Sequence, residues 1–580
     1  MTVCCQMLTP AHTQSIILER IDGDPSTMTV NDPIISEATF MNSTGFSSNQ
    51  SAANTNLNIN GPSVIRVPDW IPEFAKTHPD ANYYMYFAHH QGRSIRMAWA
   101  NTIQGPWHIF NMGFAPDKSW GYGGNYSGLL TIGNGVLDIE LGSTTGTIEI
   151  DNNYIIGDHI ASPDVVVDNV NERIIMYFHG FSLNTTSGQQ TFVASSKYGL
   201  NFNILSDGGE VGQGIRAVVP GHFYFRTFQV EGEVNGQNVL QSFAYANRGL
   251  LYKAPTLTFG DVPANLANGD DLGGLWNPTT ATITPWWTLI PDTDNPLFQV
   301  QASLAVRPNG NESRRIDNSN SNSPRHFAVY HDPVGDRNKI YILYTGRGDA
   351  PESVVLVMCD LTGLSEEERL DPSKWRRTLA MEEFILEPEE NWEGADLAIE
   401  YSSGGLAVNK RQLRDPYLFK DADGQLYLFY TGRGEEAIGV AKLTLTETIR
   451  VSPKVLLGGA YENSTASMAD ALRTNNLLPS VEPYSALGYS NIQNTGVKVP
   501  SSMFSLTGDN AVVDWVLVDL LDATHSLVAR RVGLLQHDGD VVEVTGVPMS
   551  FINVLAGNYH VALRHRNHLG VMTQQTYMID

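Results

Sequence analysis

The sequence predicts an all-β protein, a five-bladed β-propeller followed by a C-terminal β-sandwich domain. Three observations predict it: short apolar strands separated by Gly, Asn, Asp and Pro, a strand pattern that recurs along the chain, and a scarcity of helical periodicity. Internal repetition at a long period is typical of solenoids and propellers, so the repeat carries most of the argument.

The recurring piece is a strand with aromatic residues at alternating positions that ends in a small or polar turn. Two copies end in the same five residues, Tyr-Thr-Gly-Arg-Gly, which is hard to attribute to chance. The copies are Asn82–His89, Arg173–Gly180, a weaker Val239–Asn247, Lys339–Gly348 and Gln425–Gly434.

Each copy is preceded by a strand that carries polar groups and is followed by an apolar strand such as Ser94–Ala100 or Ala437–Leu443. The preceding strands are Pro62–Asp69, Ile160–Asp168, Phe223–Phe228, Pro324–Tyr330 and Leu413–Phe419. An ordered recurrence of polar, aromatic and apolar strands favours a radial array of small sheets over a pair of β-sandwiches. Another blade could lie in the long segment Tyr252–Asn322.

Composition changes divide the chain into three parts. Residues 1–60 are rich in Ser, Thr, Asn and Asp and predict a polar N-terminal extension, with 42–56 as a loop or linker. Residues 61–450 hold the repeats and form the propeller. Residues 451–580 contain further alternating strands and have the size of a separate β-sandwich. The clearest helix candidate is Asn463–Asn476.

The charge balance excludes some partners. The 580 residues include 37 Lys and Arg against 62 Asp and Glu, a net charge of −25, whereas a nucleic-acid binder needs a basic surface. No apolar run reaches the length of a membrane span, and no export signal is visible at the N-terminus. Three cysteines cannot form a disulfide scaffold, and no Cys/His spacing resembles a zinc site.

The propeller segment, over about residues 60–445, resembles the glycosyl-hydrolase superfamily of arabinanases, levansucrases and invertases. The resemblance rests on Gly61–Trp70, Tyr86–Gly92, His159–Asp164, Asn391–Asp396 and Gln412–Tyr417. It implies a five-bladed propeller acting on sugars. The C-terminal stretches Gly508–Trp515, Leu534–Asp540 and Ala562–Thr573 resemble a module of large secreted marine and Bacteroidetes-type proteins, which implies export and an accessory role.

Glycoside hydrolysis needs two carboxyl groups, one as acid and one as base or nucleophile. In the related hydrolases, inner strands of the first three blades supply them, which points to Asp69 and Asp164 as the catalytic carboxylates here. The third inner strand offers Arg226 in place of an acid, with Glu231 and Glu233 only nearby. This departure from the family pattern argues against a standard two-carboxylate mechanism.

Histidine and arginine offer other chemistry. His89 and His159 are candidate catalytic groups because imidazole exchanges protons near neutral pH. Arginines on inner strands suit an anionic sugar, since a guanidinium fork matches a carboxylate. The candidate substrate-binding residues are His90, Arg226, Arg325, His326, Glu393, Asp396, Arg414 and Asp415.

Three functions remain open from the sequence. The first is a secreted enzyme that cleaves glycosidic bonds, in an acidic polysaccharide or oligosaccharide. The second is a lyase that acts on uronic-acid glycans by β-elimination through His and Arg. The third is a non-catalytic propeller lectin. We expect a monomer, outside the cell or in the periplasm, with no required cofactor and no metal at the catalytic residues, and with room for a structural calcium ion at the propeller axis.

Overall fold

The computed structural model divides into two compact units. One contains residues 18–304 and 314–443, and the other contains residues 1–17, 305–313 and 444–580. The structure describes residues 3–5, 13–23, 32–36, 39, 58–90, 92–110, 135–138, 148–151, 154–169, 171–182, 188–202, 216–219, 222–254, 274–277, 282–285, 287–297, 305–306, 313–314, 323–332, 337–377, 383–544, 546–552, 554 and 557–579.

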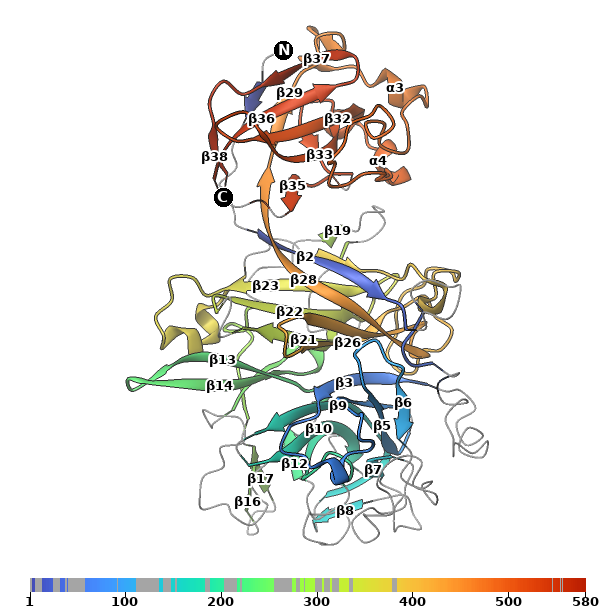
Figure 1. Ribbon diagram of the computed structural model, residues 1–580, viewed down its shortest axis with the longest axis vertical. Helices are drawn as coiled ribbons and strands as arrows, with labels where there is room; N and C mark the ends of the chain where they lie inside the picture. The colour runs from blue at the N-terminus through green and yellow to red at the C-terminus, as the bar shows by residue number, and fades with distance from the viewer. Residues whose placement is uncertain are drawn as a thin grey trace. The chain divides into compact units, whose positions relative to one another are not determined.

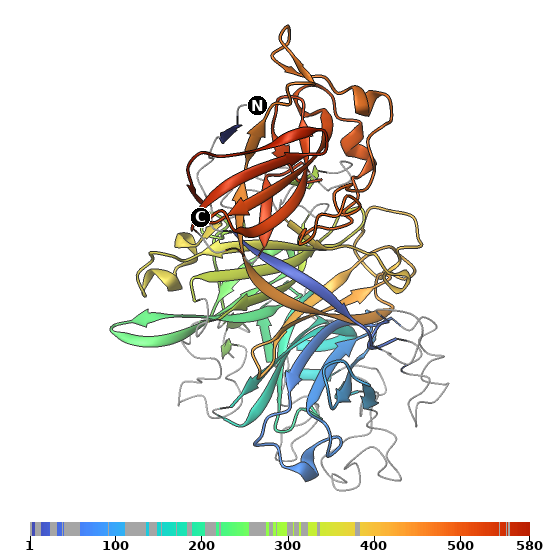
Figure 2. The same ribbon diagram turned by 45° about the horizontal axis from the view of Figure 1, so that its top comes forward.

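The larger unit is built from antiparallel sheets that follow one another along the chain (Figures 1 and 2). Five of these sheets among the described residues have at least four strands in a row. In four of them the strands follow one another in chain order from the inner strand outward, and in the fifth the outermost strand is formed by residues 13–21.

Sheet 1 contains β3 (Asn60–Arg66), β4 (Tyr83–Ala88), β5 (Ser94–Ala100) and β6 (His108–Phe110), with β7 (Leu137–Asp138) paired to β5. Sheet 2 contains β9 (Tyr154–Asp168), β10 (Arg173–Ser182), β11 (Gln189–Ser196) and β12 (Arg216–Val219), with β8 (Ile148–Asp151) paired to β9. Sheet 3 contains β13 (Arg226–Val234), β14 (Gln237–Tyr245), β15 (Leu251–Lys253) and β18 (Thr288–Leu289).

Sheet 4 contains β21 (Pro324–His331), β22 (Lys339–Gly346), β23 (Val354–Asp360) and β24 (Arg376–Arg377), with β25 (Glu383–Leu386) paired to β23. Sheet 5 contains β26 (Arg414–Lys420), β27 (Leu426–Gly432), β28 (Ala437–Val451) and β2 (Thr13–Ile21).

The first strands of the five sheets pack against one another around a common axis. β3 contacts β9 and β26, and β21 contacts β13 and β26. Asp164 on β9 accepts hydrogen bonds from the amide and hydroxyl of Thr227 on β13, which closes the ring. The all-β propeller expected from the repeat is therefore confirmed. Most of residues 255–322, where a further blade was considered, lie outside the described residues, so the blade count stays a prediction.

The aromatic second strands fill the spaces between the sheets. All six residues of β4 are buried, and alternate side chains of a strand point to opposite faces. Tyr84 and Tyr86 therefore pack with residues of sheet 2, while Met85 and Phe87 pack with residues of sheet 5. Burying large aromatic side chains on both faces supplies much of the hydrophobic stabilisation of such a fold.

Parts of the N-terminal segment form a strand and buried contacts, while the polar extension predicted over residues 1–60 stays a prediction. Residues 13–21 form β2, and Ile34 and Ile35 are buried beside β28, where Ile35 pairs with Ile438. Arg20 at the end of β2 forms an ion pair with the buried Glu393. The buried contacts of these isoleucines and of Arg20 tie the described residues of this segment to sheet 5 and to Glu393. The loop predicted at 42–56 lies outside the described residues.

The smaller unit is centred on a sheet in the order β34-β33-β32-β36-β37, with β38 paired to β36. Its strands are β32 (Val512–Leu521), β33 (Leu527–Gln536), β34 (Val541–Val542), β36 (Gly557–His565), β37 (His568–Met572) and β38 (Tyr577–Ile579). Its other described elements include β1 (Val3–Cys5), β29 (Pro453–Val455), β30 (Tyr461–Glu462), β31 (Ser467–Met468), β35 (Met549–Ile552), α3 (Ala471–Thr474) and α4 (Ser501–Phe504). The expected β-sandwich stays a prediction for this unit.

The helix predicted over Asn463–Asn476 is wrong in extent. Only α3 is helical, and the residues before it form turns and the short strand β31. Thr465 and Ser467 hydrogen-bond each other through their side chains, the kind of local competition that keeps such residues out of helices. Among the described residues, no helix has both the length and the apolar character needed to cross a membrane.

Candidate active site at the propeller axis

A β-bulge recurs in four of the five inner strands. The pairing register slips between Asn60 and Ser63 in β3, between Ala161 and Asp164 in β9, between Arg325 and Ala328 in β21, and between Arg414 and Tyr417 in β26. A bulge bends its strand and re-aims a side chain, which makes it a common device next to active sites.

Each of the four bulges contains a residue with positive φ, a backbone conformation that is uncommon for residues other than glycine. A fifth such residue, Tyr224 with φ 58°, lies just before β13. The residues in the bulges are Gly61 (φ 61°), Ser162 (φ 49°), His326 (φ 52°) and Asp415 (φ 48°). Gly61 also allows a close approach, because a Cβ there would lie 2.8 Å from the Cα of Ser162.

Asp415 and His326 meet at the axis. His326 Nε2 lies 3.6 Å from Asp415 Oδ1, and the two residues are 3% and 2% exposed. The ring of Tyr224 packs edge-on against His326 at 4.4 Å between centroids and against His179 at 5.2 Å. Three of the five residues with positive φ, namely Tyr224, His326 and Asp415, thus form one contact group.

The electrostatics of this pair argue against an ion pair. Burial and the nearby Glu435 raise the pKa of Asp415 to about 6, against the opposing effect of Arg226, Arg414 and Arg325. Burial and the same three arginines hold the pKa of His326 well below its usual range. His326 is therefore neutral near pH 7, while Asp415 titrates where an acid–base group is most useful.

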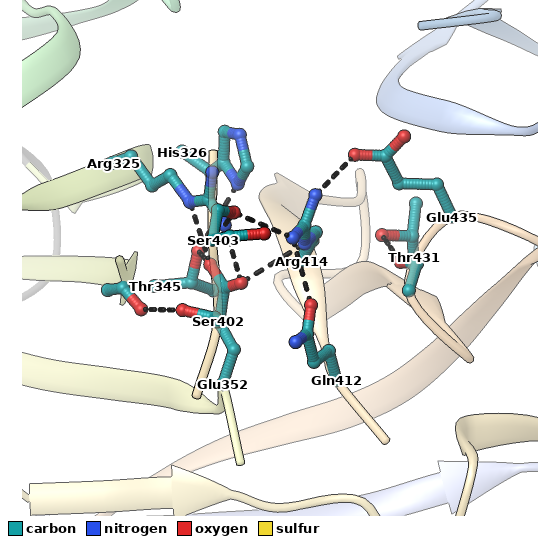
Figure 3. Close-up of polar contacts among 12 residues, drawn as sticks. Arg325, His326, Thr345, Glu352, Ser402, Ser403, Gln412, Arg414, Thr431 and Glu435 are labelled. Carbon is teal, nitrogen blue, oxygen red and sulfur yellow. Dashed lines mark hydrogen bonds and ion pairs between the residues drawn. The ribbon is translucent and has the colours of Figure 1, made fainter. Parts of the chain in front are cut away.

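Arg325 and Arg414 are already neutralised by buried carboxylates (Figure 3). Glu352 accepts from Arg325 Nε and Nη2 at 2.9 and 2.6 Å and from Arg414 Nε at 3.0 Å. Arg414 Nη1 donates to Glu435 at 2.8 Å, and His90 Nδ1 lies 3.2 Å from the other oxygen of Glu435. Despite burial, which acts in the opposite direction, Arg325 and Arg414 lower the pKa of Glu352, and His90 and Arg414 lower that of Glu435 to about 2.

Asp164 and Arg226 lie on the neighbouring inner strands. Both hydrogen bonds that Asp164 accepts from Thr227 fall on Oδ2. Burial raises the pKa of Asp164, with Arg226 and Thr227 opposing it. Arg226 Nη1 donates to the carbonyls of Ser162 and Pro163, which ties β13 to the bulge of β9.

The predicted histidines gather at the same end of the inner strands. His89 and His90 follow β4, whose last residue pairs with Asn60 at the start of β3. His159 on β9 lies 5.6 Å from His179, between ring centroids, and its Nε2 is 3.0 Å from the amide of Gln189. His179 is buried, and burial with the nearby His159 holds its pKa well below its usual range.

Several buried polar atoms around the axis have no hydrogen-bond partner among the described residues. Buried polar groups are normally paired, so a cluster of exceptions marks a place where a ligand can supply the missing bonds. The atoms are Asn60 Oδ1, Ser162 Oγ, His179 Nδ1, Arg226 Nε and Asp415 Oδ2. Donors and acceptors are both present, which suits a hydroxyl-rich molecule.

Three predicted residues lie elsewhere. Asp69 is exposed in a turn beyond the end of β3 opposite to Gly61. Glu393 is buried and accepts from Arg20, Tyr430 and two backbone amides, so its oxygens are committed to structure. Asp396 is exposed and paired with Arg433.

Sequence reasoning missed Tyr224, Ser162, Glu352 and Glu435. The sequence did carry a signal for the bulge position, because Gly61, Ser162 and Asp415 each directly precede a proline. Glu352 and Glu435 lie in loops after second strands, where no periodicity distinguishes them. Among the described residues, no group of three His, Cys, Asp or Glu side chains is arranged to hold a metal ion.

No protein-family model matches the chain. It is 25% identical over 395 residues to a protein of Acanthamoeba polyphaga mimivirus called "Uncharacterized protein R118", which covers 67% of this chain and 84% of that protein.

Similar solved structures include glycoside hydrolases and a deacetylase. An α-L-arabinofuranosidase from Lactobacillus brevis covers 67% of this chain and 92% of its own, with 10% identity and a TM-score of 0.33. A β-xylosidase/α-arabinofuranosidase from a compost metagenome, bound to xylotriose, matches over 76% of this chain and 95% of its own, with 11% identity and a TM-score of 0.31. An N-acetylgalactosamine deacetylase from F. plautii, bound to blood group B trisaccharide, matches over 67% of this chain and 90% of its own, with 10% identity and a TM-score of 0.33. These values are too low to transfer a reaction, so the function is argued from the site itself.

Proposed function

We propose that the axial site binds a saccharide and cleaves a glycosidic bond, with Asp415 as the group that exchanges a proton with the substrate. The observation that carries the proposal is the state of Asp415. It is buried, its pKa is raised to about 6, and its Oδ2 has no partner among the described residues. A carboxyl group with these properties is protonated often enough near neutral pH to act as a general acid.

A second carboxyl group is needed for hydrolysis, and Asp164 is the candidate. Like Asp415, it is a buried carboxylate at the bulge of an inner strand, and both of its hydrogen bonds from Thr227 fall on one oxygen. Arg226 acts electrostatically on both carboxyl groups, since it lowers the pKa of each against the effect of burial. Asp69 has no role in this mechanism.

The substrate class follows from the charge at the axis. Arg325 and Arg414 are paired with Glu352 and Glu435, so they do not offer a fork to a sugar carboxylate. Arg226 is the third arginine that acts on Asp415, and its Nε has no hydrogen-bond partner among the described residues. A saccharide with few charges fits this site better than a heavily anionic chain.

The second candidate is β-elimination from a uronic acid. It is favoured by the contact of Tyr224 with the neutral His326, because an aromatic hydroxyl and an imidazole can share the proton movements of elimination. In that case Arg226 would neutralise the sugar carboxylate.

The test is a screen of the protein against neutral and uronate-containing polysaccharides, in which reducing ends and ultraviolet absorbance of unsaturated uronates are followed together. We expect new reducing ends without absorbance, lost in Asp415→Asn and in Asp164→Asn but kept in the exposed control Asp69→Asn. Absorbance that rises with the new ends would favour elimination. Binding on a glycan array without either product would leave a lectin.

A further inference from the structure

A chain of four buried groups leads from a loop of sheet 4 to Asp415. Glu352 Oε1 lies 2.8 Å from Thr345 Oγ1, and Thr345 Oγ1 lies 3.2 Å from His326 Nδ1. His326 Nε2 then faces Asp415 Oδ1 at 3.6 Å. Figure 3 shows Thr345 between Glu352 and His326.

The protons in this chain can be counted from its charged end. Glu352 binds two guanidinium groups, and their effect lowers its pKa despite burial, so it is ionised and can only accept. Thr345 has a single hydroxyl proton, which it donates to Glu352. The oxygen of Thr345 is then available to His326 only as an acceptor, so His326 Nδ1 must donate.

His326 has only one ring proton to give. Its surroundings disfavour a second one, because it is buried and because Arg325, Arg414, Arg226 and His90 all act against an imidazolium. The charged and titratable groups in contact with the ring are Asp415 and Tyr224, with Glu352 acting through Thr345 and Glu435 acting on Asp415.

We propose that Thr345, held by Glu352, fixes the ring proton of His326 on Nδ1 and so keeps Nε2 as a bare acceptor opposite Asp415. Thr345 is therefore a positioning residue. A protonated Asp415 can donate to Nε2, whereas an ionised Asp415 faces another lone pair and gains nothing. This arrangement favours the protonated form of Asp415. Only the catalytic use of that proton rests on the proposed function.

The repeated Tyr-Thr-Gly-Arg-Gly sequence provides a matched control. Thr431 occupies the place of Thr345 in the next sheet and is equally buried, but its hydroxyl donates to the carbonyl of Gly434. The same substitution at the two positions therefore removes the same atoms from similar surroundings. Only the change at Thr345 removes the acceptor for His326.

The experiment measures the tautomer of His326 by long-range proton–nitrogen NMR of the histidine-labelled full-length protein, with the signal assigned by its loss in His326→Gln. We expect the Nδ1-protonated form in the wild type, in Thr345→Ser and in Thr431→Val. In Thr345→Val we expect a population with the proton on Nε2, where it can bond an ionised Asp415. The midpoint of the carboxyl titration of Asp415 then falls by about one pH unit.

An Nε2-protonated wild type would overturn the inference, as would a Thr345→Val protein whose tautomer and Asp415 midpoint are unchanged. If Thr345→Val does not fold, Thr345→Ser still tests the inference. It keeps the hydroxyl, so its His326 must keep the proton on Nδ1. The readout does not depend on turnover. The expected tautomer without cleavage of any saccharide would therefore refute the proposed function and leave this inference standing.

Discussion

Replacing Asp415 by Asn should stabilise the protein near neutral pH. The folded state holds the pKa of this buried carboxyl at about 6, through burial and Glu435, whereas an unfolded chain holds it near 3.8. Above about pH 6 both states are ionised, and the difference between the two pKa values corresponds to about 3 kcal/mol against folding. Below about pH 4 both states are protonated and the penalty vanishes.

Asn removes the charge and can donate its amide to the bare Nε2 of His326. The free energy of unfolding of Asp415→Asn should therefore exceed that of the wild type by up to about 3 kcal/mol at pH 8, and the difference should shrink steadily as the pH falls toward about 4. Denaturant unfolding at several pH values, followed at the propeller transition, measures this difference. The exposed control Asp69→Asn should change stability little at any pH. If Asp415→Asn is less stable than the wild type, or if the difference in free energy of unfolding does not depend on pH, the raised pKa of Asp415 is refuted.

Three further changes test the buried ion pairs by the same denaturation assay. Glu352→Gln should lower the free energy of unfolding by about 3–5 kcal/mol, because it leaves two buried guanidinium groups uncompensated. The control Glu366→Gln, at a partly exposed partner of Arg337, should lower it by less than about 1 kcal/mol. Equal losses in the two variants would contradict the burial argument. Glu393→Gln should cost about 3 kcal/mol and should raise protease cleavage near Arg20, since it breaks the ion pair that holds β2; unchanged cleavage would count against that contact. Asp519→Asn should lower the free energy of unfolding of the smaller unit alone by about 3 kcal/mol, because Asp519 is fully buried between Arg530 and Arg564. A shift in the unfolding transition of the propeller would be inconsistent with two separate compact units.

The sequence predicted the propeller because its signal is periodic. The polar, aromatic and apolar strands recur, and each aromatic second strand is buried on both faces, as in β4. The same periodicity located the inner strands and with them Asp164, Arg226, His326 and Asp415. It could not rank these residues, because their roles depend on which neighbours neutralise them.

Asp69 shows why strand position alone is insufficient. It lies in a turn just beyond the correct strand, at the end away from the bulge, so it is exposed while Gly61 occupies the axial position. Alignment of the inner strands on the proline after the bulge would have placed Gly61, Ser162 and Asp415 together. The sequence still would not have shown that Glu352 and Glu435 neutralise two arginines, because they come from loops far from those arginines in the chain.

The most direct test of the central claim is the origin of the oxygen at a newly formed chain end. The saccharide identified in the screen is incubated with the protein in water labelled with a heavy oxygen isotope, and the products are weighed by mass spectrometry. We predict that each cleavage by the wild type places one labelled oxygen on the new reducing end, and that Asp415→Asn forms no such product. Unlabelled, unsaturated ends would show elimination, and equal labelling by Asp415→Asn would show that Asp415 does not move the proton.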